Sequence, residues 1–299
     1  MLKPMTHATI DTFSAAHDSL KLRHRCKITN IFLDSTSLQE IFSERHCLQY
    51  NTDKALFLLV PRHNSYYDCL YMAVDELALK KGIEEVLSNY HSEMSIRGAV
   101  IGKEPQAAEI AEIFHDLGFR LTKRLLRMQL GAPAQKILDA MRPFADENRD
   151  SMSFATPDDA EEILEILKDN FDLVADNLPE LSVIRDNIVK KQVAILRRDN
   201  KIASLHYFHI YNSTLHSLYD VTRKEYRKEG FFMALAIFIN EYFSGQSKKS
   251  MRAFGWRDAT NQKLVKHARK SNQNSDGVII YNMLWEPSDM DSEVEEHHK

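Results

Sequence analysis

The stretch that constrains this chain most is residues 214–243, where a strand-like segment passes through a basic turn into a long apolar segment. Thr214 to Val221 is rich in β-branched, aromatic and apolar residues, which is typical of a strand. From Phe231 to Phe243 nearly every residue is apolar or a good helix former, which predicts a mostly buried helix. A strand that turns into a helix start aims free backbone N–H groups and the positive end of the helix dipole at one spot. The stretch therefore predicts an anion site, and phosphate is the commonest anion at such sites.

The turn itself is basic and ends in a glycine. Its positive charge comes from Arg223, Lys224, Arg227 and Lys228. Gly230 has no Cβ to obstruct a ligand that approaches the backbone. The alternative interpretation is a solvated basic turn before a core helix, which is the ordinary case for such a turn on its own. The surrounding elements decide between the two interpretations.

The sequence Arg227-Lys228-Glu229-Gly230-Phe231-Phe232 resembles the R/Q-x-x-G-x-G/A pyrophosphate loop of the GNAT (Gcn5-related) N-acetyltransferases. The strand that ends at Val221 precedes the loop at the spacing usual for that family. Phe232 departs from the pattern, because it stands where glycine or alanine is expected, and it would narrow the cofactor groove. The resemblance implies that acetyl-CoA is the cosubstrate and that its diphosphate lies on the amides of Arg227, Lys228, Glu229, Gly230, Phe231 and Phe232.

Length and composition suit a two-domain globular protein. The chain has 299 residues, of which 43% are hydrophobic and 27% charged, and a net charge of −4 disfavours a nucleic-acid partner. Cys26, Cys47 and Cys69 show no CxxC spacing, so neither a disulfide framework nor a metal site is expected. No apolar run reaches the roughly 20 residues of a membrane helix, and no secretory signal is visible. We expect a cytoplasmic protein with no membrane partner.

The order of predicted elements after residue 151 is strand, two helices, three strands, helix, strand, helix, strand, which resembles a complete GNAT domain. In the first half, Ile110 to Phe119 resembles the last helix of the family and its LY-x-x-x-GF ending, with Phe114 at the place of the tyrosine. The predicted fold class is therefore α/β (α+β), with two GNAT-like domains, each a mixed, mostly antiparallel central sheet flanked by helices. The predicted divisions are a degenerate N-terminal domain over 1–131, a linker over 132–150, an acetyl-CoA-binding domain over 151–286 and a disordered acidic tail over 287–299.

Within the first half, Ala55 to Val60 predicts a strand that Pro61 ends, and Tyr66 to Lys81 predicts a helix that Gly82 ends. The turn after Val60 lacks glycine, so we expect that this copy does not hold coenzyme A. A polar and aromatic cluster would lie at the predicted helix start, either as part of an acceptor pocket or as surface and capping residues. It consists of Arg62, His63, Tyr66, Tyr67 and Asp68.

The resemblance also implies further cofactor contacts. In the family, exposed backbone of the central strand near a β-bulge holds the pantetheine and the thioester, and the matching residues are Leu218, Tyr219, Asp220 and Val221. Asn261, expected one turn inside the next helix, matches an asparagine that commonly lies near the cofactor.

Acetyl transfer to an amine needs a base for the amine, a donor for the oxyanion and a proton for the departing thiolate. His216 on the central strand is a candidate base; its alternative role is a packed sheet histidine. The tyrosine that the family often places seven residues after Asn261 falls on Ala268, so the expected acid is absent. His267 is a candidate substitute, with an exposed helix histidine as the alternative. Tyr219 is a candidate acid or a groove-lining residue.

Other groups near the central strand are weaker candidates. His206 and His209 lie on the adjacent strand. Asp220 is either a base or a residue that fixes the turn beside the loop, and the second role is favoured.

The resulting hypothesis is transfer of an acetyl group from acetyl-CoA to a primary amine of a small molecule. Direct attack in a ternary complex is favoured, because no cysteine lies near the loop. One alternative is a catalytically weak acyl-CoA-binding or partner-binding module, which Phe232 and Ala268 favour. Another is a transferase for longer acyl-CoA or carrier-protein thioesters, with Phe231 and Phe232 lining a tunnel. A monomer and a homodimer are both consistent with the sequence.

Overall fold

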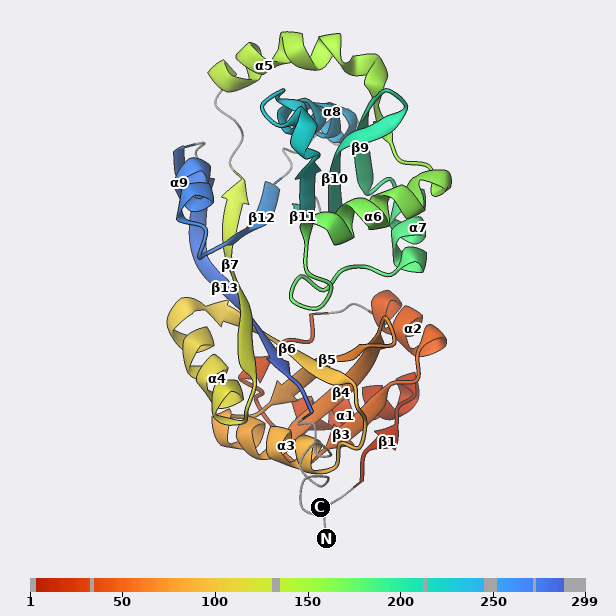
Figure 1. Ribbon diagram of the computed structural model, residues 1–299. Helices are drawn as coiled ribbons and strands as arrows, with labels where there is room; N and C mark the ends of the chain where they lie inside the picture. Colours follow the sequence, from red (N-terminus) through yellow and green to blue (C-terminus); the bar gives the residue numbers. More distant parts are fainter. Residues whose placement is uncertain are drawn as a thin grey trace, which may run out of the picture. The chain divides into compact units, whose positions relative to one another are not determined.

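The computed structural model describes residues 4–32, 35–130, 135–211, 214–244, 252–270 and 273–287. These form two compact units (Figure 1). Unit 1 contains the residues up to Arg124 and those from Ile279 on, and unit 2 contains Leu125 to Val278. The chain thus leaves unit 1 at one point and returns to it near its end.

Unit 1 is a sheet with helices on both faces. Its strands lie in the order β1-β3-β4-β5-β6-β13, and β2 pairs with β5 outside that order. Neighbours among β3, β4 and β5 are antiparallel, whereas β6 runs parallel to β5. Its elements are β1 (Thr6–His7), α1 (Ile10–Arg23), β2 (Ile28–Thr29), α2 (Ser35–Glu44), β3 (Leu48–Asn51), β4 (Ala55–Arg62), β5 (Tyr66–Ala73), α3 (Glu76–Ser88), β6 (Ser95–Lys103), α4 (Glu104–Asp116), and parts of β7 (Arg120–Leu130) and β13 (Gln273–Trp285).

Two apolar clusters hold these layers together. On one face of the sheet, Phe57 packs with Ile83 of α3 and Phe114 of α4. On the other face, Leu58 packs with Phe13 of α1. Successive side chains of β4 point to opposite faces of the sheet, and each face is covered by its own helices. Every residue from Ala55 to Val60 is therefore buried.

The predicted helix over Tyr66 to Lys81 is wrong in its first half. Tyr66–Ala73 is strand β5, and α3 begins only at Glu76. Strands β4 and β5 form a hairpin whose turn residues His63 and Asn64 have positive φ values of 50° and 52°, so no glycine is required. A run that is apolar on both faces has no clear period, which is why helix and strand could not be told apart.

Other details of unit 1 also differ from the predictions. Pro61 does not end β4, which continues to Arg62. Gly82 lies inside α3, where a Cβ would be 2.3 Å from Phe57 Cε2, so this glycine permits close packing of the helix on the sheet. The polar cluster predicted at a helix start lies on the β4–β5 hairpin instead.

Unit 2 repeats the plan. Its strands lie in the order β8-β9-β10-β11-β12-β7, with β12 parallel to β11. Helices α6 and α7 cover one face through Ile163 and Ile184, and α8 covers the other through Leu235. Its elements are the second part of β7, α5 (Gln135–Glu147), β8 (Met152–Phe154), α6 (Ala160–Asn170), α7 (Leu181–Val189), β9 (Val193–Arg198), β10 (Lys201–Tyr211), β11 (Thr214–Thr222), α8 (Phe231–Ser244), β12 (Arg252–Asp258), α9 (Gln262–Lys270) and the first part of β13.

The predicted order of elements after residue 151 is confirmed. The strand ending near Val221, the helix from Phe231 and the Asp199-Asn200 hairpin turn all lie where the sequence places them. Thr156 is the N-cap at the predicted helix start, and Asp159 belongs to the same capping box, since its Oδ2 accepts from the backbone N–H of Thr156 at 2.8 Å.

The last strand of each half joins the unit built mainly from the other half. The later residues of β7, from the first half, pair antiparallel with β12, from Leu125↔Asp258 to Leu130↔Ala253. The end of β13, from the second half, completes the sheet of unit 1 beside β6. The unit boundaries therefore differ from the predicted divisions at 131 and 286, and the predicted linker 132–150 contains helix α5.

Candidate functional site

The centre of unit 2 is a fork between β11 and β12. The two strands pair in parallel over four residues, from Thr214↔Arg252 to Ser217↔Gly255. β11 then continues to Thr222 without β12, whereas β12 continues to Asp258 and stays paired antiparallel with β7. Of the strands that the structure describes, none besides β10 pairs with β11 beyond Ser217. We call the place where β11 and β12 separate the unit 2 fork; the edge of β11 facing it carries N–H and C=O groups without a strand partner.

A β-bulge lies at the base of this fork. Tyr207 of β10 pairs with Tyr219, but the next residue, Phe208, pairs with Ser217, so Leu218 is an extra residue in β11. A bulge bends its strand and increases the local twist. The bulge that the family resemblance implies near Leu218 is therefore present, and it lies where β11 and β12 stop pairing.

The basic loop begins where β11 ends. Lys228 and Gly230 have φ values of +82° and +72°, and α8 starts at Phe231. Within the described residues, the backbone N–H groups of Lys228, Gly230, Phe231 and Phe232 donate to no protein acceptor. Alternating right- and left-handed backbone at a helix start makes a concave set of N–H groups that suits an anion.

The charges around this loop are exposed. Lys224, Arg227 and Lys228 are all exposed, and Arg227 Nε donates to the carbonyl of Thr222 at 3.3 Å. The guanidinium of Arg223 is already bonded within the protein, because it donates to Glu162 Oε1 at 2.9 Å. Three basic side chains thus remain in solvent beside the free amides.

Gly230 faces helix α5 rather than a ligand. A Cβ at this position would lie 3.0 Å from Met141 Cε and 3.3 Å from Phe144 Cε1. The expectation that its missing side chain admits a ligand is therefore corrected: the glycine admits α5 and provides the positive φ of the turn.

The two phenylalanines of the loop have different surroundings. Phe231 is 1% exposed and stacks on Phe144 with 6.2 Å between ring centroids, so its side chain belongs to the core and lines no tunnel. Phe232 is partly exposed, and its ring centroid lies 5.7 Å from that of His206. The departure from the glycine of the family pattern thus places a ring on a buried histidine.

That histidine belongs to a polar cluster at the fork. Ser217 Oγ donates to Asp220 Oδ1 at 3.0 Å, and His206 Nε2 lies 3.0 Å from the same oxygen. Arg257, from β12, reaches across the fork to Asp220 Oδ2 at 3.5 Å. Burial lowers the pKa of His206, with Asp220 acting in the opposite direction. Asp220 therefore organises this cluster and does not fix the turn.

His216 lies on the opposite face of β11 from this cluster. Its ring is half-buried, 5.8 Å from the ring of Tyr211 and 6.0 Å from that of Phe254, measured between centroids. Burial and the charge of Arg127 lower the pKa of His216 below its ordinary value. Within the described residues its ring nitrogens have no protein hydrogen bond, so a neutral imidazole is available there to accept a proton. Burial lowers the pKa of the neighbouring His209 to about 4.

The hydroxyl of Tyr219 is already engaged. Its single O–H is shared between the backbone carbonyl oxygens of Asp176 and Asn177, each at 3.0 Å, and so ties β11 to the segment between α6 and α7. This position suits an anchor better than the general acid suggested by the sequence.

We expect Tyr219→Phe to change kcat by less than about threefold, because the ring remains and only hydrogen bonds worth roughly 1 kcal/mol each are lost. Steady-state kinetics measure this, and proteolysis of the 171–180 segment reports the loss of anchoring. A fall of 100-fold or more with an altered alkaline limb of the pH profile would return Tyr219 to the role of acid.

The remaining predicted residues lie at the end of β11 and at or in α9. Asn261 precedes α9 and its carbonyl accepts from Val265 N at 3.0 Å, so it caps the helix start and does not lie one turn inside. Ala268, at the place of the family's tyrosine, is 3% exposed. The side chain of His267 lies outside the described residues. Val221 is a core residue whose backbone alone can serve a ligand.

Similar proteins are found by structure alone. No family model matches the chain, and no curated protein matches its sequence. A tandem GNAT protein from the clavulanic acid biosynthesis pathway matches with a TM-score of 0.59 and 11% identity, over 96% of this chain and 99% of that one. The chain has the tandem GNAT fold. A GNAT-family acetyltransferase from Colwellia psychrerythraea matches with a TM-score of 0.52 and 10% identity, over 94% of this chain and 98% of that one.

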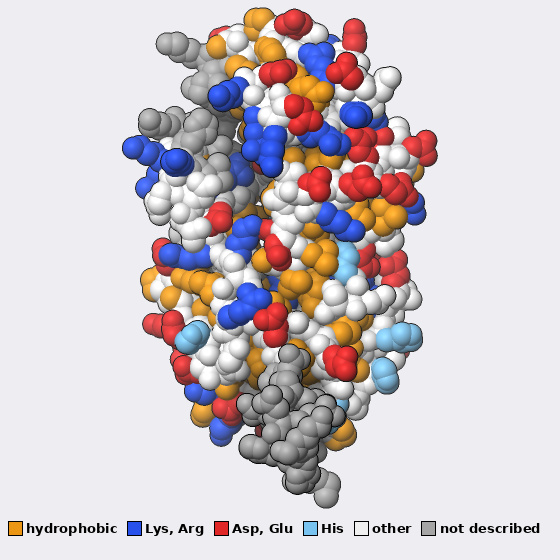
Figure 2. All heavy atoms as spheres, viewed as in Figure 1, with side chains coloured by type: hydrophobic (Ala, Val, Ile, Leu, Met, Phe, Trp, Pro, Cys, Tyr) orange, Lys and Arg blue, Asp and Glu red, His pale blue; other side chains and the backbone are white. Residues whose placement is uncertain are grey.

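The GNAT fold confirms the predicted fold class and tandem arrangement. Among the described residues, no helix is long and apolar enough to span a membrane, and no three metal-ligating side chains gather at one place. Figure 2 shows acidic and basic side chains interspersed over the visible face. Sequence reasoning did not predict the cluster of His206, Ser217, Asp220 and Arg257, because it depends on the register that the bulge sets.

Proposed function

We propose that this GNAT-fold protein is an acyltransferase that moves an acetyl group from acetyl-CoA to a primary amine of a small molecule, with the cofactor in unit 2. The observation that carries the proposal is the separation of β11 from β12 at the bulge, from which β11 leads directly into a basic loop with free amides. A ligand that has both peptide-like amides and a diphosphate matches this edge and this loop together.

In this proposal the diphosphate is held by the amides of Lys228, Gly230, Phe231 and Phe232, and Arg227 and Lys228 add charge. The backbone of Leu218 to Val221, beyond the last residue of β11 that pairs with β12, bonds the amides of the pantetheine. His216 accepts the proton that the amine loses as its nitrogen forms a bond to the acyl carbon and the C–S bond breaks. Ala268 offers no proton, so the thiolate takes its proton from water.

The first test is cofactor binding. Calorimetry is expected to give a complex with CoA and acetyl-CoA, and the double variant Arg227→Glu, Lys228→Glu is expected to weaken it at least tenfold. Two charge reversals beside a diphosphate replace attraction by repulsion, and single charged contacts contribute about 1.5–3 kcal/mol.

The matched control for this test is Lys201→Glu, an exposed charge reversal at the start of β10 in the same unit. It should bind CoA with the native affinity. No binding by the native protein at millimolar ligand, or equal binding by the double variant, would refute the placement of the cofactor.

A second candidate is an acyl-CoA-binding module without turnover. The ion pair between Asp220 and Arg257 across the fork favours it, as does the buried Ala268 in place of an acid. Saturable CoA binding with no release of free thiol over a broad panel of amines would select this function. Thiol release with any amine of the panel selects the transferase.

A further inference from the structure

Unit 1 contains a fork with the same plan as that of unit 2. β5 and β6 pair in parallel over four residues, from Tyr66↔Ser95 to Cys69↔Gly98. β5 then continues to Ala73 and β6 continues to Lys103. In both units a hairpin strand leads into a helix, and the next strand returns parallel to it. The place that corresponds to the edge of β11 after Ser217 is therefore the edge of β5 after Cys69.

In unit 1 this edge is occupied by the chain itself. Strand β2 pairs antiparallel with β5, with Thr29 opposite Met72 and Ile28 opposite Ala73. Lys27 N donates to the carbonyl of Ala73 at 3.2 Å. The segment from Lys27 to Ile31 thus adds an extended backbone at a position where no described strand lies in the fork of unit 2.

Asn30 completes the occupation with its side chain. Its backbone N–H donates to the carbonyl of Tyr71 at 3.1 Å, and its Oδ1 accepts from the N–H of Tyr71 at 2.7 Å. Its Nδ2 donates to the carbonyl of Cys69 at 2.9 Å and to that of Ala99 at 3.1 Å. Since Cys69 lies on β5 and Ala99 on β6, this one amide spans the fork. The residue is 7% exposed, so these bonds are shielded from water.

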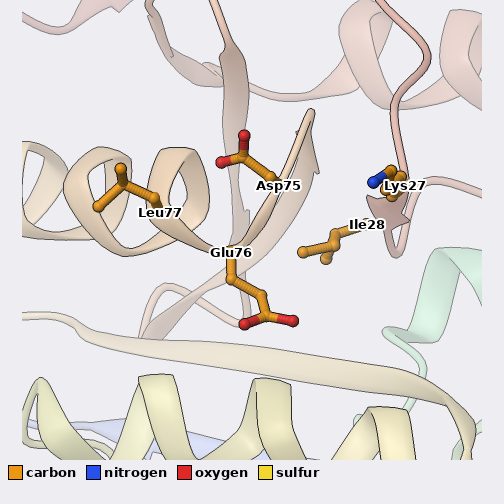
Figure 3. A pocket seen from close by; sticks show the side chains of 5 residues that line it. All are labelled: Lys27, Ile28, Asp75, Glu76 and Leu77. Atoms are coloured by element: carbon orange, nitrogen blue, oxygen red, sulfur yellow. The ribbon is translucent and has the colours of Figure 1, made fainter.

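The helix start of unit 1 also differs from that of unit 2. Asp75 Oδ1 accepts from Ala78 N at 2.8 Å and so takes one of the helix N–H groups, and Glu76 lies in the first turn. Figure 3 shows Asp75 and Glu76 from this helix start, and Lys27 and Ile28 from the β2 segment, lining one pocket. Two carboxylates at this place repel a phosphate, whereas the corresponding loop of unit 2 carries exposed basic residues.

We propose that the Lys27–Ile31 segment is a permanent internal occupant of the unit 1 fork. Its backbone and the Asn30 amide take the hydrogen bonds that an amide-bearing ligand would make there. Unit 1 is thereby closed to acyl-CoA, and the chain binds one acyl-CoA, in unit 2. The statement about unit 2 rests on the proposed function, whereas the occupation of unit 1 does not.

Amide hydrogen exchange tests the occupation without any ligand. The N–H of Tyr71 is expected to exchange slowly in the native protein and at least tenfold faster in Asn30→Ala, because its acceptor is then lost. Asn282→Ala is the matched control: Asn282 is also a buried asparagine of unit 1, but it binds Arg97. That control should leave the Tyr71 amide protected. Fast exchange of Tyr71 in the native protein, or no change in Asn30→Ala, overturns the proposal.

Stoichiometry tests the consequence for ligands. Calorimetry with acetyl-CoA is expected to give one site per native chain and no site in the Arg227→Glu, Lys228→Glu variant at the same concentrations. Two sites in the native chain, or one site that survives in the variant, would place acyl-CoA in unit 1 and overturn the proposal. If the native chain binds no acetyl-CoA, the proposed function fails while the exchange experiment still decides the occupation of unit 1. If Asn30→Ala does not fold, the exchange rate of Tyr71 in the native protein decides it.

Discussion

Replacement of His216 by glutamine is expected to lower kcat for acetyl transfer about 100-fold while the affinity for CoA stays within twofold of native. General base catalysis by a positioned side chain contributes roughly 10²–10⁴-fold, and glutamine keeps the size and polarity of the site without accepting the proton. His115→Gln, an exposed histidine of α4 in unit 1, is the control. Full activity of His216→Gln would assign proton abstraction to another group or to water.

The pH profile gives an independent check of the same role. Burial and Arg127 both lower the pKa of His216, so the neutral, proton-accepting form persists to lower pH than for an ordinary histidine. The acid limb of kcat/KM is therefore expected below about pH 6.5, the unperturbed value. Arg127→Gln should move this limb to higher pH, because one of the two causes of the lowered pKa is removed. An acid limb above pH 6.5 in the native enzyme contradicts the assignment.

Replacement of Arg97 by methionine is expected to reduce the free energy of unfolding of unit 1 by about 3–5 kcal/mol. Arg97 and Asp68 form an ion pair at 2.6 Å with side chains only 8% and 10% exposed, and Arg97 also donates to Asn282 at 2.8 Å. Removal of one partner leaves the other charge buried without compensation, which is the costly case. Removal of both, in Arg97→Met with Asp68→Leu, should restore most of the loss.

The tryptophans allow this loss to be assigned to unit 1. The chain has two, of which Trp285 lies in unit 1 and Trp256 in unit 2. A Trp256→Phe background leaves Trp285 as the fluorescent reporter in urea unfolding. Arg120→Met is the control, since its ion pair with Glu286 is largely exposed, and exposed pairs contribute about 0–1 kcal/mol. Equal losses for Arg97→Met and the control would show that burial of the pair has no energetic consequence.

The sequence was most informative where the signal was local. The strand ending near Val221, the basic turn and the helix from Phe231 were predicted correctly, because propensity, charge and a positive-φ residue all act within a few residues of each other. The resemblance to the GNAT loop followed from the same stretch. Tyr66 to Ala73 was misassigned, because a strand covered on both faces carries no period that separates it from a helix.

The parts that were missed depend on register and on distant segments. His206, Ser217 and Arg257 meet at Asp220 only because a bulge shifts β11 by one residue against β10. The packing of α5 on Gly230 was not predictable from a stretch that reads as a charged linker. The role of Asn30 was hidden too, since no pattern shows that a side-chain amide from residue 30 joins two strands near residues 69 and 99.

The reciprocal placement of β7 and β13 bears on why both halves of such a chain persist. A gene that lost its first half would encode a unit 2 without the strand beside β12, and a gene that lost its second half would encode a unit 1 without the strand beside β6. Selection for the chemistry of one unit therefore also preserves the other, even when the other has no chemistry of its own. Each unit therefore depends on a strand from the half of the chain that mainly builds the other unit.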